Sequence, residues 1–506
     1  MDDLLLLYPN RQSYPKQMDK LEDVLELALA EIVRLREEKA TLTHTHFGQK
    51  SEQTKATEPV TEKYPRKPRN RNQDNYQHKG RNPFPEHLPV DVIEYDLKPE
   101  EKLCACCQGF LIKIGKEVTR QLDLVPQTII VREHTKLKYA CRKCGRTVKL
   151  ASMPWQPIEK GAVGPALLAY IIVSKYQDGL PLYRIQRQLK RYGVEVSRAT
   201  LWGWVRQSAN LLEVLCEKIK EEVVAGKIAF SDDTHLLMLE PGAGKAKTST
   251  MWAHGRKAIE GQGALTVYEF TSGRHGKNPQ EFFKDFMGTI QADLYQGYGK
   301  LFACDENGNA KRKLAACWAH VRRKFVDVVR NDPTSIAQEM VTMINALYAI
   351  EKAARKEGIT GEVLRLERLE KSAPILQNIF AWLKKYQQET PPTMALGKAI
   401  NYALKAWQAL QTFLDDGHIE IDNNRAERAI KTVVIGRKNF LFVGSENGGK
   451  TAAILFSLVE TCKQNDIDSL AYLTDVLKRL PNHPYQRVSE LLPHHWKPPQ
   501  KTVAAA

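Results

Sequence analysis

Three acidic residues stand where apolar segments end or a helix begins. Asp232 follows the apolar run "KIAFS", Asp293 ends "GTIQAD", and Glu427 lies in "DNNRAERAI". Carboxylates that share one site repel one another, so such a set is costly unless divalent cations neutralise it. Two Mg²⁺ or Mn²⁺ ions held about 3.5–4 Å apart support in-line displacement at phosphorus. Asp232, Asp293 and Glu427 are therefore predicted to be the catalytic and metal-binding residues of a phosphoryl-transfer site.

Each acid also has a simpler interpretation. Asp232 and Asp293 could end strands as turn formers. Asn424 could cap a helix, with Glu427 three residues later as its capping-box partner. Catalysis is favoured only if the three acids lie together in the fold, which depends on the strands and the helix that carry them.

The segment after Lys227 alternates between strands and helices. Three strands, a helix and two further strands are followed by a helix, a long helical stretch, and a closing strand, loop and helix. The expected strands are 227–239, 248–256, 264–270, 288–293 and 313–320, the helices 278–287 and 321–330, and the helical stretch 332–410. This order matches an RNase H-like sheet, in which the first and fourth strands are neighbours. Asp232 and Asp293 would then lie side by side.

Two cysteine pairs predict a zinc site. Cys104 and Cys107 form one Cys-x-x-Cys pair, and Cys141 and Cys144 form the other. Four thiolates suit tetrahedral, structural Zn²⁺, and the strand-like alternation between the pairs is typical of a zinc ribbon. Cys106 is a spare ligand, and a redox role for the pairs is the competing interpretation.

A helix-turn-helix is predicted in "LPLYRIQRQLKRYGVEVSRATLWGWVRQSANLL". The turn falls at Tyr192-Gly193-Val194, and Ser197 caps the second helix. Arg198, Thr200 and Arg206 lie on that second helix and are the expected DNA contacts. Helical hairpins without a DNA role are common, so this role depends on context.

The charge balance favours a polyanionic partner. The 506 residues include 75 Lys+Arg against 59 Asp+Glu, giving a net charge of +16 and a pI near 9.2. Nucleic acid is the usual partner of such a chain. A heptad seam from Met18 to Leu42 predicts a short coiled coil that joins two copies into a homo-oligomer, with a lone amphipathic helix as the alternative. The basic, Pro-rich stretch from 53 to about 85 is expected to be a linker.

No segment has the roughly 18 unbroken apolar residues of a membrane span, and the N-terminus lacks a signal-peptide pattern. The expected location is therefore the cytoplasm, with no membrane partner.

The segment "GSENGGKT" at 444–451 matches a phosphate-binding loop. A P-loop NTPase is therefore an alternative. No apolar strand ending in Asp follows the segment to carry a second magnesium contact, which argues against this alternative.

The chain resembles transposases of the insertion-sequence-66 family, which are DDE recombinases. The similar stretches extend from near the N-terminus to "LLPHHW" and include "FGQKSE", "SDDT", "QADLYQGY", "CWAHVRRKF", "IDNNRAERAI", "GRKNFLFVGS" and "SLVET". Family members usually have Asp-Glu-Thr where this chain has Asp232-Asp233-Thr234, a change that keeps the acidic pair. The resemblance implies that Asp232, Asp293 and Glu427 occupy the three acidic positions.

The resemblance also implies a DNA transposase that acts on the terminal inverted repeats of an insertion sequence by metal-dependent cleavage and strand transfer. Its partners would be the double-stranded transposon ends and target, with small accessory proteins encoded beside it. Cations expected to contact phosphates are Arg322, Arg323, Lys324, Arg428, Lys431, Arg437 and Lys438. A catalytically silent DNA-binding regulator and a plain RNase H-like nuclease are the remaining alternatives.

The expected fold is multidomain: a coiled-coil helix, a zinc ribbon, an all-α helix-turn-helix, and an α/β RNase H-like catalytic domain with a helical insertion. The expected boundaries are 1–52 for the coiled coil, 53–95 for the linker, 96–158 for the zinc ribbon, 159–225 for the helix-turn-helix, 226–330 and 411–475 for the catalytic core, 331–410 for the insertion, and 476–506 for the tail.

Overall fold

The computed structural model describes residues 34–35, 128–140, 148–159, 161–240, 242, 244–303 and 311–498. All elements below belong to the unit formed by residues 1–48 and 129–506. The four expected zinc ligands and the linker lie outside the described residues. So does the expected coiled coil, apart from Arg34 and Leu35, which are helical.

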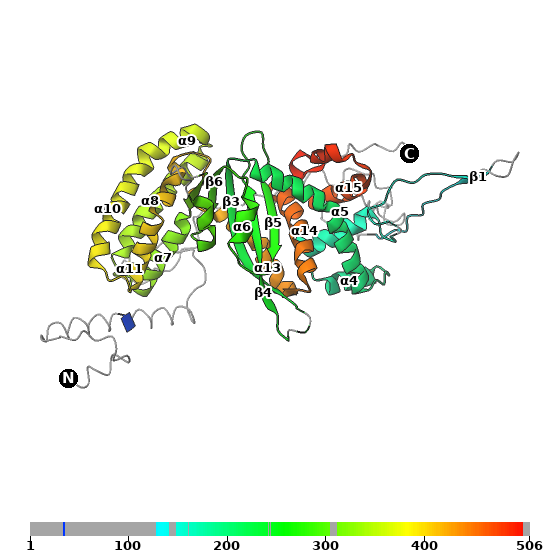
Figure 1. Ribbon diagram of the computed structural model, residues 1–506, viewed down its shortest axis with the longest axis horizontal. Coiled ribbons are helices and arrows are strands. Elements are labelled where there is room, and N and C mark those ends of the chain that lie inside the picture. The colour runs from blue at the N-terminus through cyan, green and yellow to red at the C-terminus, as the bar shows by residue number, and fades with distance from the viewer. Residues whose placement is uncertain are drawn as a thin grey trace, which may run out of the picture. The chain divides into compact units, whose positions relative to one another are not determined.

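A mixed sheet forms the centre of the described chain (Figure 1). Its strand order is β5-β4-β3-β6-β7, and β8 pairs with the far end of β3. β3 is antiparallel to β4, and β4 to β5, whereas β6 and β8 run parallel to β3, and β7 parallel to β6. The strands are β3 (Ile228–Met238), β4 (Lys247–Arg256), β5 (Leu265–Thr271), β6 (Gly288–Ala292), β7 (Arg312–Ala316) and β8 (Phe442–Val443).

The register of β3 against β6 brings two acids to one place. The paired residues run from Ile228 opposite Thr289 to Phe230 opposite Gln291. Asp232 and Asp293 each stand two residues beyond that last pair. The expected adjacency of the first and fourth strands is confirmed.

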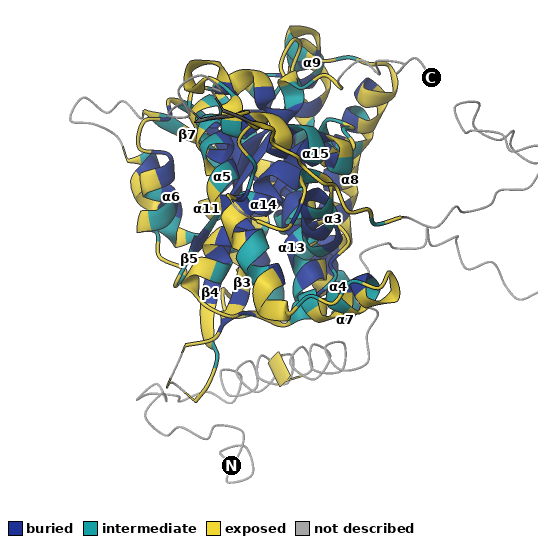
Figure 2. Ribbon diagram, turned by 90° about the vertical axis from the view of Figure 1, so that its right-hand side faces the viewer, coloured by how far each residue is buried: buried dark blue, intermediate teal, exposed yellow. Residues whose placement is uncertain are grey.

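Helices from both ends of the chain cover the sheet. α3 (Pro165–Tyr176), α5 (Arg198–Val224), α14 (Glu446–Gln464) and α15 (Ser469–Arg479) share one hydrophobic core with the sheet, and their inner faces are buried (Figure 2). α13 (Asn424–Phe440) packs on β3 and β4.

The expected helix-turn-helix segment forms two helices and a turn. α4 (Leu182–Arg191) is joined to α5 by a turn in which Gly193 has φ +77°, a conformation that glycine adopts without a Cβ penalty. The Ser197 side chain accepts a hydrogen bond from the Thr200 amide at 3.0 Å, so the predicted cap is confirmed. α5 is 27 residues long, and its inner face is buried against α3 and α14.

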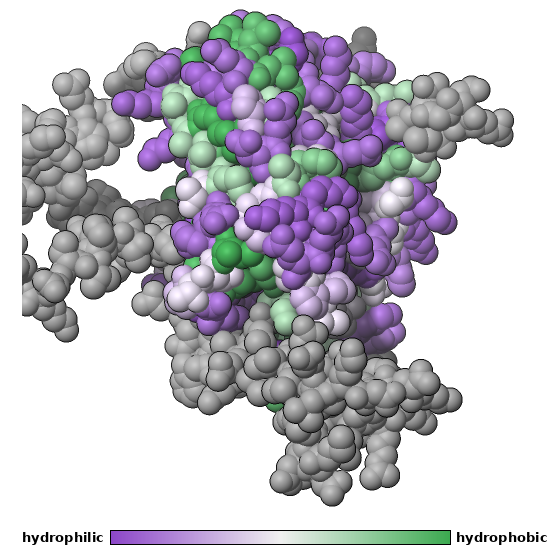
Figure 3. Space-filling model, turned by 90° about the vertical axis from the view of Figure 1, so that its left-hand side faces the viewer, coloured by the Kyte–Doolittle hydropathy of each residue, from purple (hydrophilic) through white to green (hydrophobic). Residues whose placement is uncertain are grey.

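A helical insertion with its own core separates β7 from α13. This second core joins α7 (Trp318–Asn331) to α8 (Ala337–Lys356), α10 (Ala373–Glu389), α11 (Ala395–Lys405) and α12 (Trp407–Gln411). The short α9 (Gly361–Glu367) lies between α8 and α10. The side of the molecule that Figure 3 shows is mostly hydrophilic, with hydrophobic side chains in scattered patches.

Two local expectations were wrong. The strand expected at 313–320 ends at Ala316, because α7 begins at Trp318. Asn424 is not the cap of α13: the cap position is Asn423, whose side chain makes no capping bond. The Asp422 carboxylate instead accepts the Asn424 amide at 3.1 Å and its side-chain nitrogen at 2.7 Å.

A short antiparallel hairpin, β1 (Lys138–Ala140) with β2 (Val148–Leu150), flanks the second cysteine pair. Among the described helices, none is long and apolar enough to cross a membrane.

Candidate active site

The three predicted acids converge from three elements. Asp232 lies in the middle of β3, Asp293 directly follows β6, and Glu427 is in the first turn of α13. Burial raises the pKa of Asp232 to about 7, and the charges of Asp293, Asp233 and Glu427 add to that rise. The structure therefore brings Asp232, Asp293 and Glu427 within electrostatic reach of one another.

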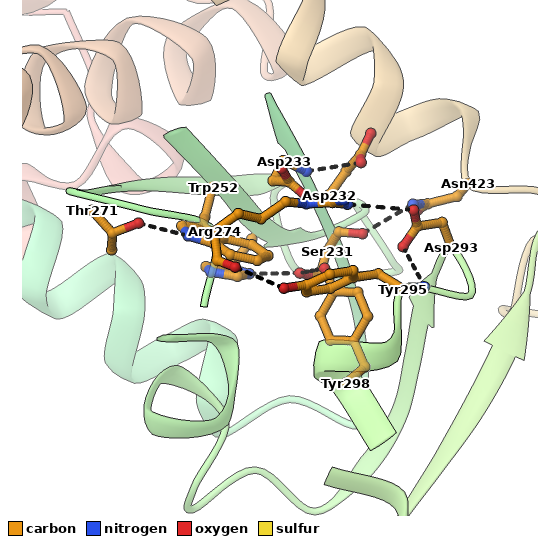
Figure 4. Close-up of polar contacts among 11 residues, drawn as sticks. Ser231, Asp232, Asp233, Trp252, Thr271, Arg274, Asp293, Tyr295, Tyr298 and Asn423 are labelled. Atoms are coloured by element: carbon orange, nitrogen blue, oxygen red, sulfur yellow. Dashed lines mark hydrogen bonds and ion pairs between the residues drawn. The ribbon is translucent and has the colours of Figure 1, made fainter. Parts of the chain in front are cut away.

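A fourth carboxylate, Asp233, belongs to the same cluster. It forms an ion pair with Arg274, a residue that the sequence did not indicate as part of the site. The Asp233 side chain is only 8% exposed, and its Oδ1 lies 2.8 Å from Nη2 of Arg274. The same Nη2 lies 3.9 Å from Oδ2 of Asp293, so Arg274 extends between the two acids (Figure 4). Burial raises the pKa of Asp233 although Arg274 opposes the rise.

Tyr295 fixes both Arg274 and Asp293. The guanidinium carbon lies 3.9 Å from the Tyr295 ring centroid, a cation–π arrangement. The Tyr295 hydroxyl donates to the Arg274 carbonyl at 2.8 Å, and its amide donates to Asp293 Oδ1 at 3.1 Å. The loop after β6 thus holds one acid and the cation that faces the other.

A buried polar network supports the site from below. Ser231 Oγ lies 2.9 Å from His254 Nδ1 and 2.7 Å from the Tyr298 hydroxyl. Burial lowers the pKa of His254 to about 3, so its ring is neutral at pH 7. The Asn423 side chain donates to the Ser231 carbonyl at 3.0 Å and ties the start of α13, and with it Glu427, to β3.

Glu427 faces α7. Its Oε1 lies 3.7 Å from His320 Nε2 and 3.9 Å from Arg323 Nη2. His320 and Arg323 are three residues apart and so share one face of that helix. Both residues lie in the "CWAHVRRKF" segment, in which the sequence indicated Arg323 but not His320 as a residue of the site.

The other cations expected near the site lie in different surroundings. Arg322 donates to Asn345 at 2.8 Å, and Lys324 lies over the Tyr402 ring at 4.4 Å, so both contact the insertion. Arg437 donates to the Thr234 hydroxyl at 2.8 Å and to the His235 carbonyl, which anchors α13 to β3. The remaining predicted DNA contacts are exposed: Arg428, Lys431 and Lys438 on α13, and Arg198, Thr200 and Arg206 on α5.

The phosphate-loop alternative lacks its loop. α14 begins at Glu446, so only Gly444 and Ser445 of the motif precede the helix. Lys450 pairs with Glu446 at 2.8 Å along that helix. A phosphate-cradling loop needs a run of free backbone amides before its helix, and this segment does not provide one.

The carboxylate cluster fits hard divalent cations. All its donors are carboxylate oxygens, which Mg²⁺ and Mn²⁺ prefer to nitrogen or sulfur ligands. Burial and the charges of neighbouring acids both disfavour the ionised form of Asp232, and a bound dication would stabilise that form. Asp232, Asp293 and Glu427 could hold such ions, with Asp233 beside them.

Four family models match successive parts of the chain. The model "Transposase IS66 family" matches residues 160–451, and "IS66 C-terminal element" matches residues 457–494. The model "zinc-finger binding domain of transposase IS66" matches residues 101–145, which contain all four expected zinc ligands. The model "Transposase C of IS166 homeodomain" matches residues 34–93, where sequence reasoning expected the end of a coiled coil and a linker.

Relatives of the same length class occur in Sinorhizobium fredii. The "Uncharacterized protein y4jD" is 36% identical over 429 residues, which cover 83% of each chain. The "Uncharacterized protein y4qI" is 36% identical over 423 residues, or 82% of this chain and 77% of the relative. The "Uncharacterized protein y4hP" is 30% identical over 494 residues, or 94% and 85%. Since the first family model alone spans more than half of the 506 residues, the chain belongs to the IS66 family of transposases.

Proposed function

We propose that this protein is a DNA transposase that binds the ends of its own element and cuts and joins strands at the carboxylate cluster. The observation that carries the proposal is the convergence of Asp232, Asp293 and Glu427 at one place, where burial raises the pKa of Asp232 to about 7 and the neighbouring acids add to the rise. The strand order β5-β4-β3-β6-β7 supports an RNase H-like core, because its first strand is central and lies beside the fourth.

The chain's own residues would bind and orient the reacting groups. Asp232, Asp293 and Glu427 would hold two divalent cations, Mg²⁺ or Mn²⁺. When bound, these cations would activate a water or 3′-hydroxyl and stabilise the leaving oxygen. Arg274, within 3.9 Å of Asp233 and Asp293, would hold their carboxylates in place. Arg323 would face the DNA phosphate beside Glu427.

The remaining parts of the chain would recognise DNA and assemble the complex. Exposed Arg198, Thr200 and Arg206 on α5 would contact the inverted repeats, as would Arg428, Lys431 and Lys438 on α13. The four-cysteine segment would bind structural Zn²⁺ and the heptad segment would pair two protomers. Accessory proteins from the same element and a location at the bacterial nucleoid belong to the same proposal.

A cleavage and joining assay tests the proposal. The substrate is duplex DNA carrying the ends that flank the gene, with Mg²⁺ or Mn²⁺, and Glu427→Gln is compared with wild type. Glu446→Gln is the matched control, because Glu446 also lies in the first turn of a helix but pairs with Lys450 away from the acids. We expect metal-dependent cleavage in the wild type and the control, and a loss of roughly 10⁴-fold in Glu427→Gln.

The other outcomes are equally informative. Tight binding of the ends without cleavage by any variant would favour a DNA-binding regulator. Equal cleavage by wild type and Glu427→Gln would remove Glu427 from the site.

A further inference from the structure

A second group of metal-ligating side chains lies outside the carboxylate cluster. Glu222, near the end of α5, meets His494 and His495 of the C-terminal segment, and one ligand atom from each lies within 4.8 Å of the others. His494 Nε2 is 3.0 Å from Glu222 Oε2. The two histidine rings lie 4.0 Å apart, centroid to centroid.

His494 is buried without the hydrogen bonds that a buried imidazole needs. Its side chain is 3% exposed, and neither ring nitrogen makes a hydrogen bond of acceptable geometry. Buried polar atoms are nearly always satisfied, so an unsatisfied ring facing a carboxylate indicates a missing partner. A cation between His494 and Glu222 would supply that partner for Nε2.

His495 is oriented as a metal-ligating histidine. Its Nδ1 lies 3.0 Å from the Ser489 carbonyl oxygen, which can only accept a hydrogen bond, so Nδ1 carries the proton. The lone pair of Nε2 is then available to bind a metal ion. Metal-binding histidines commonly have the second nitrogen fixed in this way. Because His495 is exposed, the site opens to solvent on that side.

The surrounding structure holds the three groups in place. Leu491 and Leu492 are fully buried just before the histidines, and just after them Trp496 donates to Asp475 at 2.8 Å. A Cβ on Gly263 would lie 2.4 Å from His494 Cβ, so only glycine there leaves room for this ring. The ligand set is therefore built by the fold and does not need to be gathered by the ion.

The positively charged Arg256 lies beside the proposed cation site. Its Nη2 lies 3.4 Å from Glu222 Oε2, and its Nη1 donates to the Gly263 carbonyl at 2.9 Å. Arg256 and His494 approach the same oxygen, Oε2, so an ion bound there would share it with Arg256, whose contact of 3.4 Å is the longer of the two. The pKa of Glu222 is lowered: burial would raise it, but His494, His495 and Arg256 together outweigh burial.

We propose that Glu222, His494 and His495 form a binding site for a transition-metal dication, with Zn²⁺ the best match and Co²⁺ or Ni²⁺ as substitutes. Two imidazoles and one carboxylate suit these borderline ions, and they do not suit Mg²⁺. Tetrahedral Zn²⁺ with bonds of 2.0–2.2 Å places its ligand atoms roughly 3.3 Å apart, close to the observed spacing of His494 and Glu222. A fourth position would hold water.

The bound ion would fasten the C-terminal segment to α5. Glu222 and the two histidines are far apart in sequence, so an ion that joins them stabilises the folded chain by mass action. This role does not depend on the carboxylate cluster or on cleavage of DNA.

Zinc stoichiometry tests the site. Full-length protein that retains its thiolate-bound zinc is titrated calorimetrically with ZnCl₂ in excess Mg²⁺, which occupies the carboxylate cluster. Bound zinc is also counted by mass spectrometry. The variants are His494→Gln/His495→Gln, His495→Gln alone and Glu222→Gln. His483→Gln is the control, because His483 lies in the same segment outside the group.

We expect wild type and His483→Gln to bind one zinc more than the double variant, and their melting temperatures to rise with zinc. Affinity should fall at least about ten-fold in Glu222→Gln. Equal zinc uptake by wild type and the double variant would overturn the proposal and leave an ordinary His494–Glu222 ion pair. If circular dichroism shows the double variant misfolded, the exposed His495→Gln decides by the same criteria.

Discussion

Two groups of buried charge in this molecule are built in opposite ways. In the helical insertion, Arg368 meets Glu351 at 2.7 Å and 2.9 Å through two of its nitrogens, and both side chains are almost fully buried. At the carboxylate cluster, one partly exposed guanidinium, that of Arg274, faces Asp233 and Asp293 while Asp232 and Glu427 lie nearby. The first group is balanced in charge, and the second is not.

The difference separates a structural ion pair from a site for chemistry. The third nitrogen of Arg368 donates to the carbonyls of Phe413 and Asp416, so every part of that pair is satisfied within the protein. The Asp232 carboxylate accepts a hydrogen bond from the Asp233 amide at 2.8 Å, but burial raises its pKa to about 7 and the surrounding acids add to the rise. Strongly perturbed acids cluster at functional sites, because only a ligand relieves their repulsion.

Breaking the balanced pair should have the largest effect on stability. Arg368→Met leaves Glu351 buried and unpaired, so we expect the free energy of unfolding to fall by about 3–5 kcal/mol. Urea denaturation followed by tryptophan fluorescence measures this, since Trp318 and Trp382 report on the core of the insertion. The double variant Glu351→Leu/Arg368→Met should recover most of the loss. A loss under 1 kcal/mol in the single variant would show that this buried pair contributes little to stability.

Neutralising Asp232 in the carboxylate cluster should raise the stability of the protein, whereas breaking the Arg368–Glu351 pair lowers it. The pKa of Asp232 is about 7 in the folded protein but about 3.9 in an unfolded chain, so the folded state binds the proton more tightly. Stability is therefore lost as pH rises from 4 to 7 and stays low above 7. Without divalent cations, Asp232→Asn should match wild type at pH 4 and exceed it at pH 8 by about 2 kcal/mol.

Chemical denaturation across this pH range measures the difference, and Mg²⁺ should close it by stabilising wild type alone. A difference that does not vary with pH would mean that Asp232 is not under electrostatic strain.

Removing Arg274 from the carboxylate cluster should sharpen the contrast further. Arg274→Gln leaves Asp233 and Asp293 without their guanidinium, so we expect stability to fall by about 1 kcal/mol, a modest loss because Arg274 is 47% exposed. Mg²⁺ should then raise the melting temperature of this variant more than that of wild type.

Arg479→Gln is the matched control, since Arg479 is 41% exposed and pairs with Asp475 far from the acids in sequence. Equal responses to Mg²⁺ in the two variants would remove Arg274 from the site.

Much of the sheet could be predicted from the sequence. The strands expected at 227–239, 248–256 and 264–270 correspond to β3, β4 and β5, and the expected adjacency of the first and fourth strands placed Asp232 beside Asp293. These predictions succeed because short strand-like runs and strand order are local and topological signals. The cap of α5 at Ser197 was equally local.

The rest depended on contacts that no sequence window contains. Arg274 is 41 residues from Asp233, in a loop whose course is set by stacking on Tyr295. The capping prediction for Asn424 failed because Asp422, two residues earlier, takes its amide. His494 and Glu222 meet only because the C-terminal segment folds back onto α5.

Breaking an exposed ion pair should have the smallest effect on stability. Lys313 and Asp415 lie 3.0 Å apart, almost as close as Arg368 and Glu351, but their side chains are 64% and 51% exposed. Water and salt screen such a pair, so Lys313→Ala should lower stability by under about 0.5 kcal/mol, and raising the salt concentration should remove even that. Urea denaturation at low and high salt measures this beside Arg368→Met. A loss comparable to that of Arg368→Met would mean that contact distance, and not burial, sets the energy of charge pairs in this protein.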